Sequence, residues 1–79
     1  MNSEWQVVDG ALHKKFEFRN FAEAFAFMTK VAAVAELQNH HPDWSNSWNI
    51  VEISLCSHDN GAITQRDHDL ANAIDELLA

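Results

Sequence analysis

The chain has 79 residues, with 5 Lys and Arg against 12 Asp and Glu, which gives a formal net charge of −7 at pH 7. A usual domain has about 100–200 residues, so residues 1–79 are expected to form a single domain. The acidic balance argues against direct binding to nucleic acid or to an anionic membrane surface, because both attract Lys and Arg. A hydrophobic share of 47% with only 2 Gly and 1 Pro predicts a folded chain.

The compartment and the oligomeric state can also be predicted. Cys56 is the sole cysteine, which excludes a disulfide within the chain and fits a reducing compartment. The first residues lack the pattern of a secretory signal, and the longest aliphatic run, Val31 to Ala35, is far shorter than the roughly 20 residues of a membrane span. A small domain without a disulfide commonly buries more surface by self-association. We therefore expect a cytoplasmic homodimer or homotetramer with no membrane partner.

The first predicted element is a β-hairpin around Asp9-Gly10, because this pair accepts the positive φ angles of a type I′ turn. In the second arm of the hairpin, Leu12, Phe16 and Phe18 share one face. Lys14 interrupts that apolar face once. The pattern predicts a strand with one side buried.

A helix is predicted from Asn20, which suits the cap position, to about Asn39, because Pro42 opposes helical geometry beyond that point. Its apolar residues form two stripes, one of Phe21, Phe25, Met28, Ala32 and Ala35 and another of Phe27, Val31 and Val34. We interpret the second stripe as free to contact a partner chain. The alternative is that both stripes belong to one wide core face.

From Trp48 the sequence alternates, with Val51, Ile53 and Leu55 on one face, which predicts a strand. Thr64, with Asp67 at the return position of a capping box, begins a final amphipathic helix. The predicted order is therefore β-β-α-β-α. It indicates an α+β fold in which the helices pack on one face of a small antiparallel sheet.

Three of the five histidines lie outside the apolar pattern: His40 and His41 follow the first helix, and His58 follows the last strand. Imidazoles both donate and accept protons near neutral pH, so such a group suits moving a proton on and off a substrate. Glu36 lies four residues before His40, and this spacing predicts a carboxylate that orients or charges the imidazole. Structural or surface roles for all three histidines are the alternative.

A zinc site is the other chemical interpretation, since His40, His41, His58 and Cys56 are all acceptable ligands. Two adjacent histidines do not easily reach one ion from the same side, and no CxxC or HExxH spacing occurs. With only Gly10 and Gly61 in the chain, no glycine-rich phosphate loop is present either. We expect no metal.

The order of these residues resembles the active-site pattern of the pterin-4a-carbinolamine dehydratases. The resemblance extends from about Trp5 to the C-terminus and includes flanking segments such as Phe16-Glu17-Phe18 and Val51-Glu52-Ile53. The pattern itself consists of Glu36, His40-His41-Pro42, Trp48, His58 and Asp67.

The resemblance implies a dehydratase that removes water from 4a-hydroxytetrahydropterin to give a quinonoid dihydropterin, in the recycling of tetrahydropterin and without a cofactor. It implies that His40 and His58 are the acid/base pair, that Glu36 supports the site electrostatically and that His41 binds the pterin. It further implies a pocket lined by Pro42, Ser57, Asp59 and Asn60.

Two other roles are compatible with the sequence. The chain could be a non-catalytic pterin-binding module, or a dimerisation partner that acts as a transcriptional coactivator, as some members of the family do. Trp44 and Trp48 could either stack on the flat pterin or pack in a core or interface.

Overall fold

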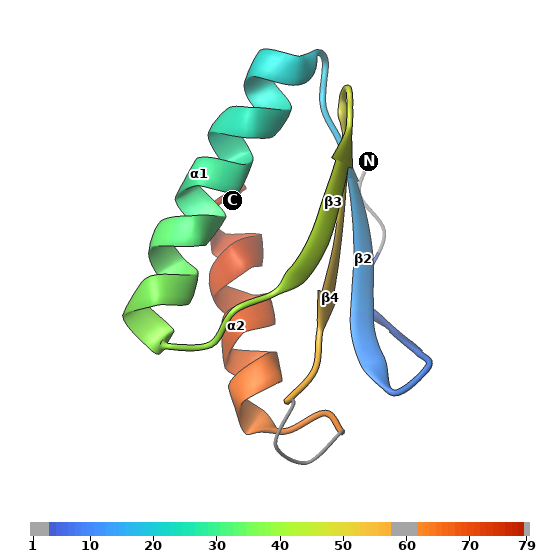
Figure 1. Ribbon diagram of the computed structural model, residues 1–79, viewed down its shortest axis with the longest axis vertical. Helices are drawn as coiled ribbons and strands as arrows, with labels where there is room; N and C mark the ends of the chain where they lie inside the picture. Colours follow the sequence, from blue (N-terminus) through green and yellow to red (C-terminus); the bar gives the residue numbers. More distant parts are fainter. Residues whose placement is uncertain (1–3, 58–61, 79) are drawn as a thin grey trace.

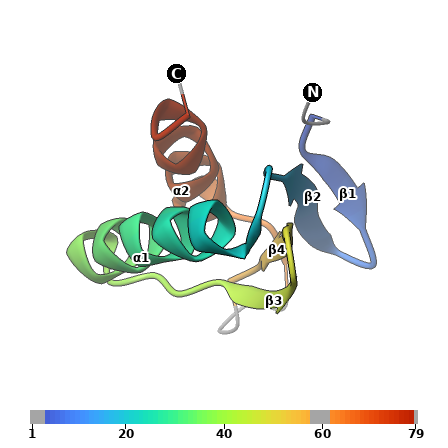
Figure 2. The same ribbon diagram turned by 90° about the horizontal axis from the view of Figure 1, so that it is seen from above.

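The structure, a computed structural model, describes residues 4–57 and 62–78. The four strands form one antiparallel sheet in the order β1-β2-β4-β3. Both helices lie on the same side of this sheet (Figure 1, Figure 2), which confirms the α+β class. The elements in chain order are β1 (Gln6–Val8), β2 (Ala11–Glu17), α1 (Phe21–Gln38), β3 (Asp43–Ser47), β4 (Ile50–Leu55) and α2 (Gln65–Glu76).

Local signals in the sequence set the hairpin and the helix ends. Asp9 and Gly10 have φ angles of 51° and 79°, as the predicted turn between β1 and β2 requires. The side chain of Asn20 accepts a hydrogen bond of 2.9 Å from the N–H of Glu23 and so caps α1. Asn39 ends α1 in the left-handed region, three residues before Pro42. These predictions are confirmed.

β3 was not predicted, and the observed order is therefore β-β-α-β-β-α. It is an edge strand of mostly polar residues, so its sequence lacks the apolar alternation that marked the other strands. Trp48, expected on the following strand, instead lies in the turn between β3 and β4, with a φ of 51° and 63% exposure. Asn46 stabilises this turn by donating from its side chain to the carbonyl oxygens of Trp48 and Ile50.

The face of α1 that covers the sheet is the one that was expected to be free. Phe27 and Val31 are buried, and the Phe27 ring lies 4.8 Å from the ring of Phe16. In contrast, Phe21 and Phe25 are 48% and 54% exposed. The assignment of Phe27, Val31 and Val34 to a free surface was therefore wrong. Ala35 of the other stripe is buried and Met28 packs against the core, so the covered face includes part of both stripes.

The hydrophobic core fills the space between the sheet and the two helices. The opposite face of the sheet carries polar side chains such as His13, Lys15 and Glu52. Among the described residues, none of the helices has the length and apolar content needed to cross a membrane. The core cluster consists of Leu12, Phe16, Ala24, Phe27, Val31, Val51, Ile53, Leu55, Leu70, Ala71 and Ile74.

Candidate active site

A buried histidine joins the end of α1 to the start of α2. His40 follows the left-handed Asn39 directly, and its backbone N–H donates to the carbonyl of Ala35 at 3.1 Å. The His40 side chain lies inside the molecule, where it is only 7% exposed. Its Nε2 atom lies 2.5 Å from Oδ1 of Asp67, a fully buried residue in the first turn of α2.

The carboxylate of Asp67 is held by several donors at once. Its Oδ2 atom accepts from the N–H of Thr64 at 2.8 Å and from the hydroxyl of Ser57 at 3.0 Å. Burial alone would raise the pKa of the Asp67 carboxyl. The hydrogen bonds from His40, Thr64 and Ser57 outweigh burial and hold this pKa below its usual value. Asp67 is therefore an anion beside His40 at neutral pH.

Ser57 connects this network to the chain that follows β4. Its N–H donates to the carbonyl of Ala62 at 3.0 Å, and its hydroxyl lies 2.6 Å from that of Thr64. Ser57 is thus buried beside Asp67. The other three residues predicted after this strand, His58, Asp59 and Asn60, lie outside the described residues.

His41 points to the other side of the chain from His40. It is 57% exposed, and its Nε2 atom lies 2.5 Å from Oε2 of Glu36. The sequence predicted that Glu36 would pair with His40, and this prediction was wrong. The left-handed turn at Asn39 ends the helix, so His40 no longer lies one helical turn above Glu36 and His41 takes its place.

The remaining predicted residues are distributed unevenly around this site. Pro42 is half-buried and directly precedes β3. Trp44 packs against the core, which favours the packing role over stacking. The β3–β4 turn, which contains Trp48, lies at the opposite end of the molecule from the end of α1 (Figure 1). Within one chain, Trp48 is therefore not brought together with His40 and His41.

The described part of the chain contains no group of three or more His, Cys, Asp or Glu side chains that could hold a metal ion. His40 is engaged by Asp67, and His41 by Glu36. Cys56 is half-buried and has no disulfide partner. His40 and His41 therefore belong to two separate imidazole–carboxylate pairs and not to a shared ligand set.

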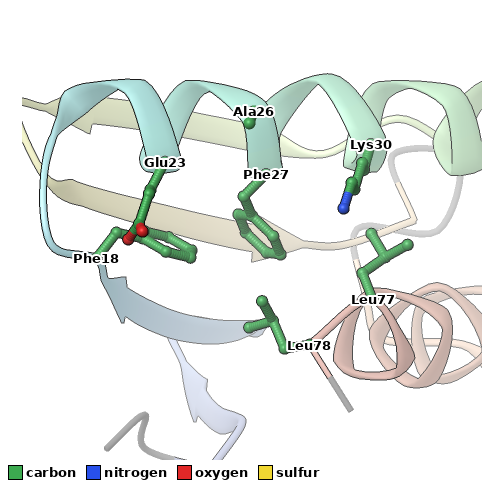
Figure 3. A pocket seen from close by; sticks show the side chains of 7 residues that line it. All are labelled: Phe18, Glu23, Ala26, Phe27, Lys30, Leu77 and Leu78. Carbon is green, nitrogen blue, oxygen red and sulfur yellow. The ribbon is translucent and has the colours of Figure 1, made fainter.

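A groove of about 250 Å³ lies away from the histidines, between the first half of α1 and the end of α2. Figure 3 shows the Phe18 and Phe27 rings and the Leu77 and Leu78 side chains around it, with Lys30 reaching over one side. Because it lies along α1 from Glu23 to Lys30, it is distant from the helix end that carries His40. We assign it no part in the chemistry of the histidines.

The local sequence predicts a helix cap at Asp67 and gives no sign that its carboxylate also holds His40. The cap uses one carboxylate oxygen, Oδ2, and leaves Oδ1 for His40. The polar residues Thr64 and Ser57 support the same carboxylate. The only signal in the sequence was the place of Asp67 in the pattern that the resemblance rests on.

Comparisons with known proteins find relatives over almost the whole chain. A family model described as pterin 4 alpha carbinolamine dehydratase matches residues 1–77. A relative from Prochlorococcus marinus (strain NATL2A), provisionally named pterin-4-alpha-carbinolamine dehydratase, is 49% identical over 77 residues, which cover 98% of this chain and 81% of the relative. A relative from Rhodospirillum rubrum with the same provisional name is 47% identical over 77 residues, covering 95% of this chain and 80% of the relative.

Two solved structures share the fold. The crystal structure of a transcriptional coactivator/pterin dehydratase from Brucella melitensis has a TM-score of 0.90 and 35% identity, covering 95% of this chain and 82% of that one. A pterin dehydratase-like protein identified as a RuBisCO assembly factor in the alpha-carboxysome has a TM-score of 0.76 and 25% identity, covering 94% of this chain and 86% of that one. With the family model matched along residues 1–77, the chain belongs to the pterin-4a-carbinolamine dehydratase family.

Proposed function

We propose that this protein catalyses the dehydration of a 4a-hydroxytetrahydropterin to a quinonoid dihydropterin and water, as a step in tetrahydropterin recycling. In this elimination the C4a–O bond breaks, the hydroxyl leaves as water with a proton from a general acid, and a base removes the N5 proton as the C4a–N5 double bond forms. The observation that carries the proposal is the buried His40–Asp67 pair, in a chain that belongs to a dehydratase family.

His40 is proposed as one member of the acid/base pair. Asp67 occupies its Nε2 atom, so the exchange of a proton with the substrate falls to Nδ1. A neighbouring carboxylate orients the imidazole, and a fixed orientation suits a ring that exchanges a proton with a bound substrate. Each such proton transfer contributes roughly 10²–10⁴-fold to a rate.

His58 is proposed as the second acid/base group on the strength of the sequence resemblance. Its described neighbour, Ser57, hydrogen-bonds to the carboxylate that holds His40, which supports a common site. His41 is proposed to bind the pterin and Glu36 to support it electrostatically through their exposed pair. Pro42, Ser57, Asp59 and Asn60 are proposed to line the pocket.

We also propose that the protein acts in the cytoplasm as a homodimer or homotetramer and requires no metal or organic cofactor. The support for self-association is the outward side of α1, where the rings of Phe21 and Phe25 are about half exposed and lie 5.7 Å apart. Two neighbouring aromatic rings in water would gain free energy by being covered.

The test is a dehydration assay on a synthetic 4a-hydroxytetrahydropterin, with and without a chelator. We expect the protein to accelerate water loss above the rate in buffer, with no effect of the chelator. Activity that a chelator abolishes would contradict the metal-free mechanism. A rate equal to that in buffer would reject the enzyme and favour the second candidate.

The second candidate is a non-catalytic role, either as a pterin-binding module or as a dimerisation partner that acts as a coactivator. Two structural neighbours support this candidate, since one is described as a transcriptional coactivator as well as a dehydratase and the other as a RuBisCO assembly factor. Pterin binding without turnover, measured by isothermal titration, would support the binding module.

A further inference from the structure

The chain makes a sharp corner between α1 and β3. Asn39 has a φ of 51° and a ψ of 43°, and its N–H bonds to the carbonyls of Ala35 and Glu36. Asn tolerates this left-handed conformation better than most residues do. We call Asn39, His40 and His41 the histidine corner. The N–H groups of Asn39 and His40 bond to carbonyls in the last turn of α1 and fix the point at which the chain leaves the helix. These bonds do not involve the carbonyl of Asn39.

Arg66 of α2 holds that carbonyl. Its Nη2 atom donates to the backbone oxygen of Asn39 at 2.7 Å. The last turn of α1 contains no basic residue, although the carbonyls at a helix C-terminus carry partial negative charge. Arg66 therefore supplies, from another helix, the positive charge that the end of α1 lacks. A hydrogen bond with a charged donor is about twice as strong as a neutral one.

The next residue of α2, Asp67, acts on the next residue of the histidine corner, His40. Asp67 follows Arg66, and its carboxylate holds the ring of His40. The first turn of α2 thus contacts the corner at two successive residues, once at the backbone and once at an imidazole. Asp67 orients the ring, and Arg66 fixes the peptide plane from which the ring projects.

We propose that Arg66 is a positioning residue for the histidine corner, and that its bond to the Asn39 carbonyl sets the direction in which His40 and His41 leave α1. The effect on turnover rests on the proposed function, whereas the effect on geometry does not. Misplacement of a reacting group by 1 Å costs roughly 100-fold in rate. Loss of one anchor, with Asp67 still in place, is expected to lower kcat/KM by about tenfold.

Three variants of the whole protein test the inference. Arg66→Gln removes the positive charge, and Arg66→Lys keeps a positive donor. Arg19→Gln is the matched control, because Arg19 is also an exposed arginine but pairs with Glu23 at the opposite end of α1. The readouts are kcat/KM and the NMR signals of the imidazoles. His13, on the far face of the sheet, serves as the internal reference.

We expect Arg66→Gln to move the signals of His40 and His41 and to lower kcat/KM, with the His13 signal unchanged. Arg66→Lys should recover most of both effects, and Arg19→Gln should match the wild type. Signals and kcat/KM of Arg66→Gln that equal those of Arg19→Gln would overturn the inference, as would equal losses in Arg66→Gln and Arg66→Lys. If the wild-type protein has no dehydratase activity, the NMR comparison still decides whether Arg66 holds the corner.

Discussion

His40 and Asp67 are 27 residues apart in the sequence, and the Nε2 atom of one lies 2.5 Å from the Oδ1 atom of the other. Both side chains are almost completely buried. Because His40 follows α1 and Asp67 lies in the first turn of α2, the pair joins the ends of the two helices at the proposed active site. It should therefore contribute to stability as well as to catalysis.

Replacement of Asp67 should lower both stability and activity. In Asp67→Asn, the charged acceptor of His40, Ser57 and Thr64 is lost, which should cost about 1–3 kcal/mol in the free energy of unfolding at pH 7. Urea denaturation measures this difference. Stability equal to that of the wild type would show that the network does not hold the helix ends together.

The contribution of Asp67 should depend on pH with a definite sign. Its pKa in the folded protein is below 3.8, the ordinary value, so its charged form is favoured by folding. The resulting stability is fully present above the unfolded pKa and is lost as the pH falls through the folded pKa. The difference in unfolding free energy between the wild type and Asp67→Asn should therefore shrink below about pH 3.8. A difference that is constant down to pH 2 would contradict the lowered pKa.

Replacement of each of the two adjacent histidines should have a different kinetic effect. His40→Gln keeps a donor for Asp67 but cannot exchange a proton, so kcat should fall by roughly 10²–10⁴-fold. His41→Ala should mainly raise KM, because His41 is proposed to bind the pterin. Steady-state kinetics on the synthetic substrate checks both. Circular dichroism confirms that each variant is folded, and similar losses of kcat in the two variants would reject the division of roles.

The exposed rings on α1 predict self-association. Phe25→Ser should shift the protein toward smaller species in sedimentation velocity at micromolar concentration, because it removes a half-exposed aromatic side chain from the proposed contact. Leu37→Ser is the control, since Leu37 is 86% exposed but lies about 120° around the helix from Phe25. A wild-type protein that is a monomer at this concentration would rule out the homodimer and the homotetramer.

A second polar cluster should stabilise the fold at the other end of α2. Lys14 donates to Asp75 at 2.8 Å, Trp5 donates to the same carboxylate, and the Lys14 amine lies 5.1 Å from the centre of the Phe16 ring. Asp75→Ala leaves a largely buried ammonium without its partner and should cost about 1–3 kcal/mol.

A double-mutant cycle tests this coupling. Lys14→Met combined with Asp75→Ala should cost less than the sum of the two single changes, because the double variant leaves no unpaired charge. Urea denaturation of the four proteins provides the comparison. Additive losses would show that Lys14 and Asp75 do not stabilise each other.

Local chemistry in the sequence was sufficient for several elements. Asp9-Gly10 predicted a turn that the φ angles of both residues confirm, and Asn20 and Thr64 marked the helix starts. The alternation of Val51, Ile53 and Leu55 marked a strand whose inner face is fully buried. In each case the deciding interaction lies within a few residues of the signal, so the sequence alone determines the outcome.

Other features depend on contacts between segments that are far apart in the sequence. β3 pairs with β4 through backbone hydrogen bonds, which do not require apolar side chains. The polar sequence of β3 therefore contains no pattern that predicts a strand. The two apolar stripes of α1 could not be ranked by their sequence, and the position of the sheet decides that Phe27 is covered and Phe25 is exposed. In the sequence, Lys14 interrupts the apolar face of a strand. In the structure, it is paired with Asp75, which lies 61 residues away.

The candidate site shows the same division. The sequence identified His40 and His41 as candidate site residues, but it paired Glu36 with the wrong one of the two. The sequence by itself determined which side chains are available and where the helix ends. The tertiary structure decided that a buried carboxylate from α2 reaches His40, because a partner 27 residues away is set by how two helices pack and not by any spacing along one of them.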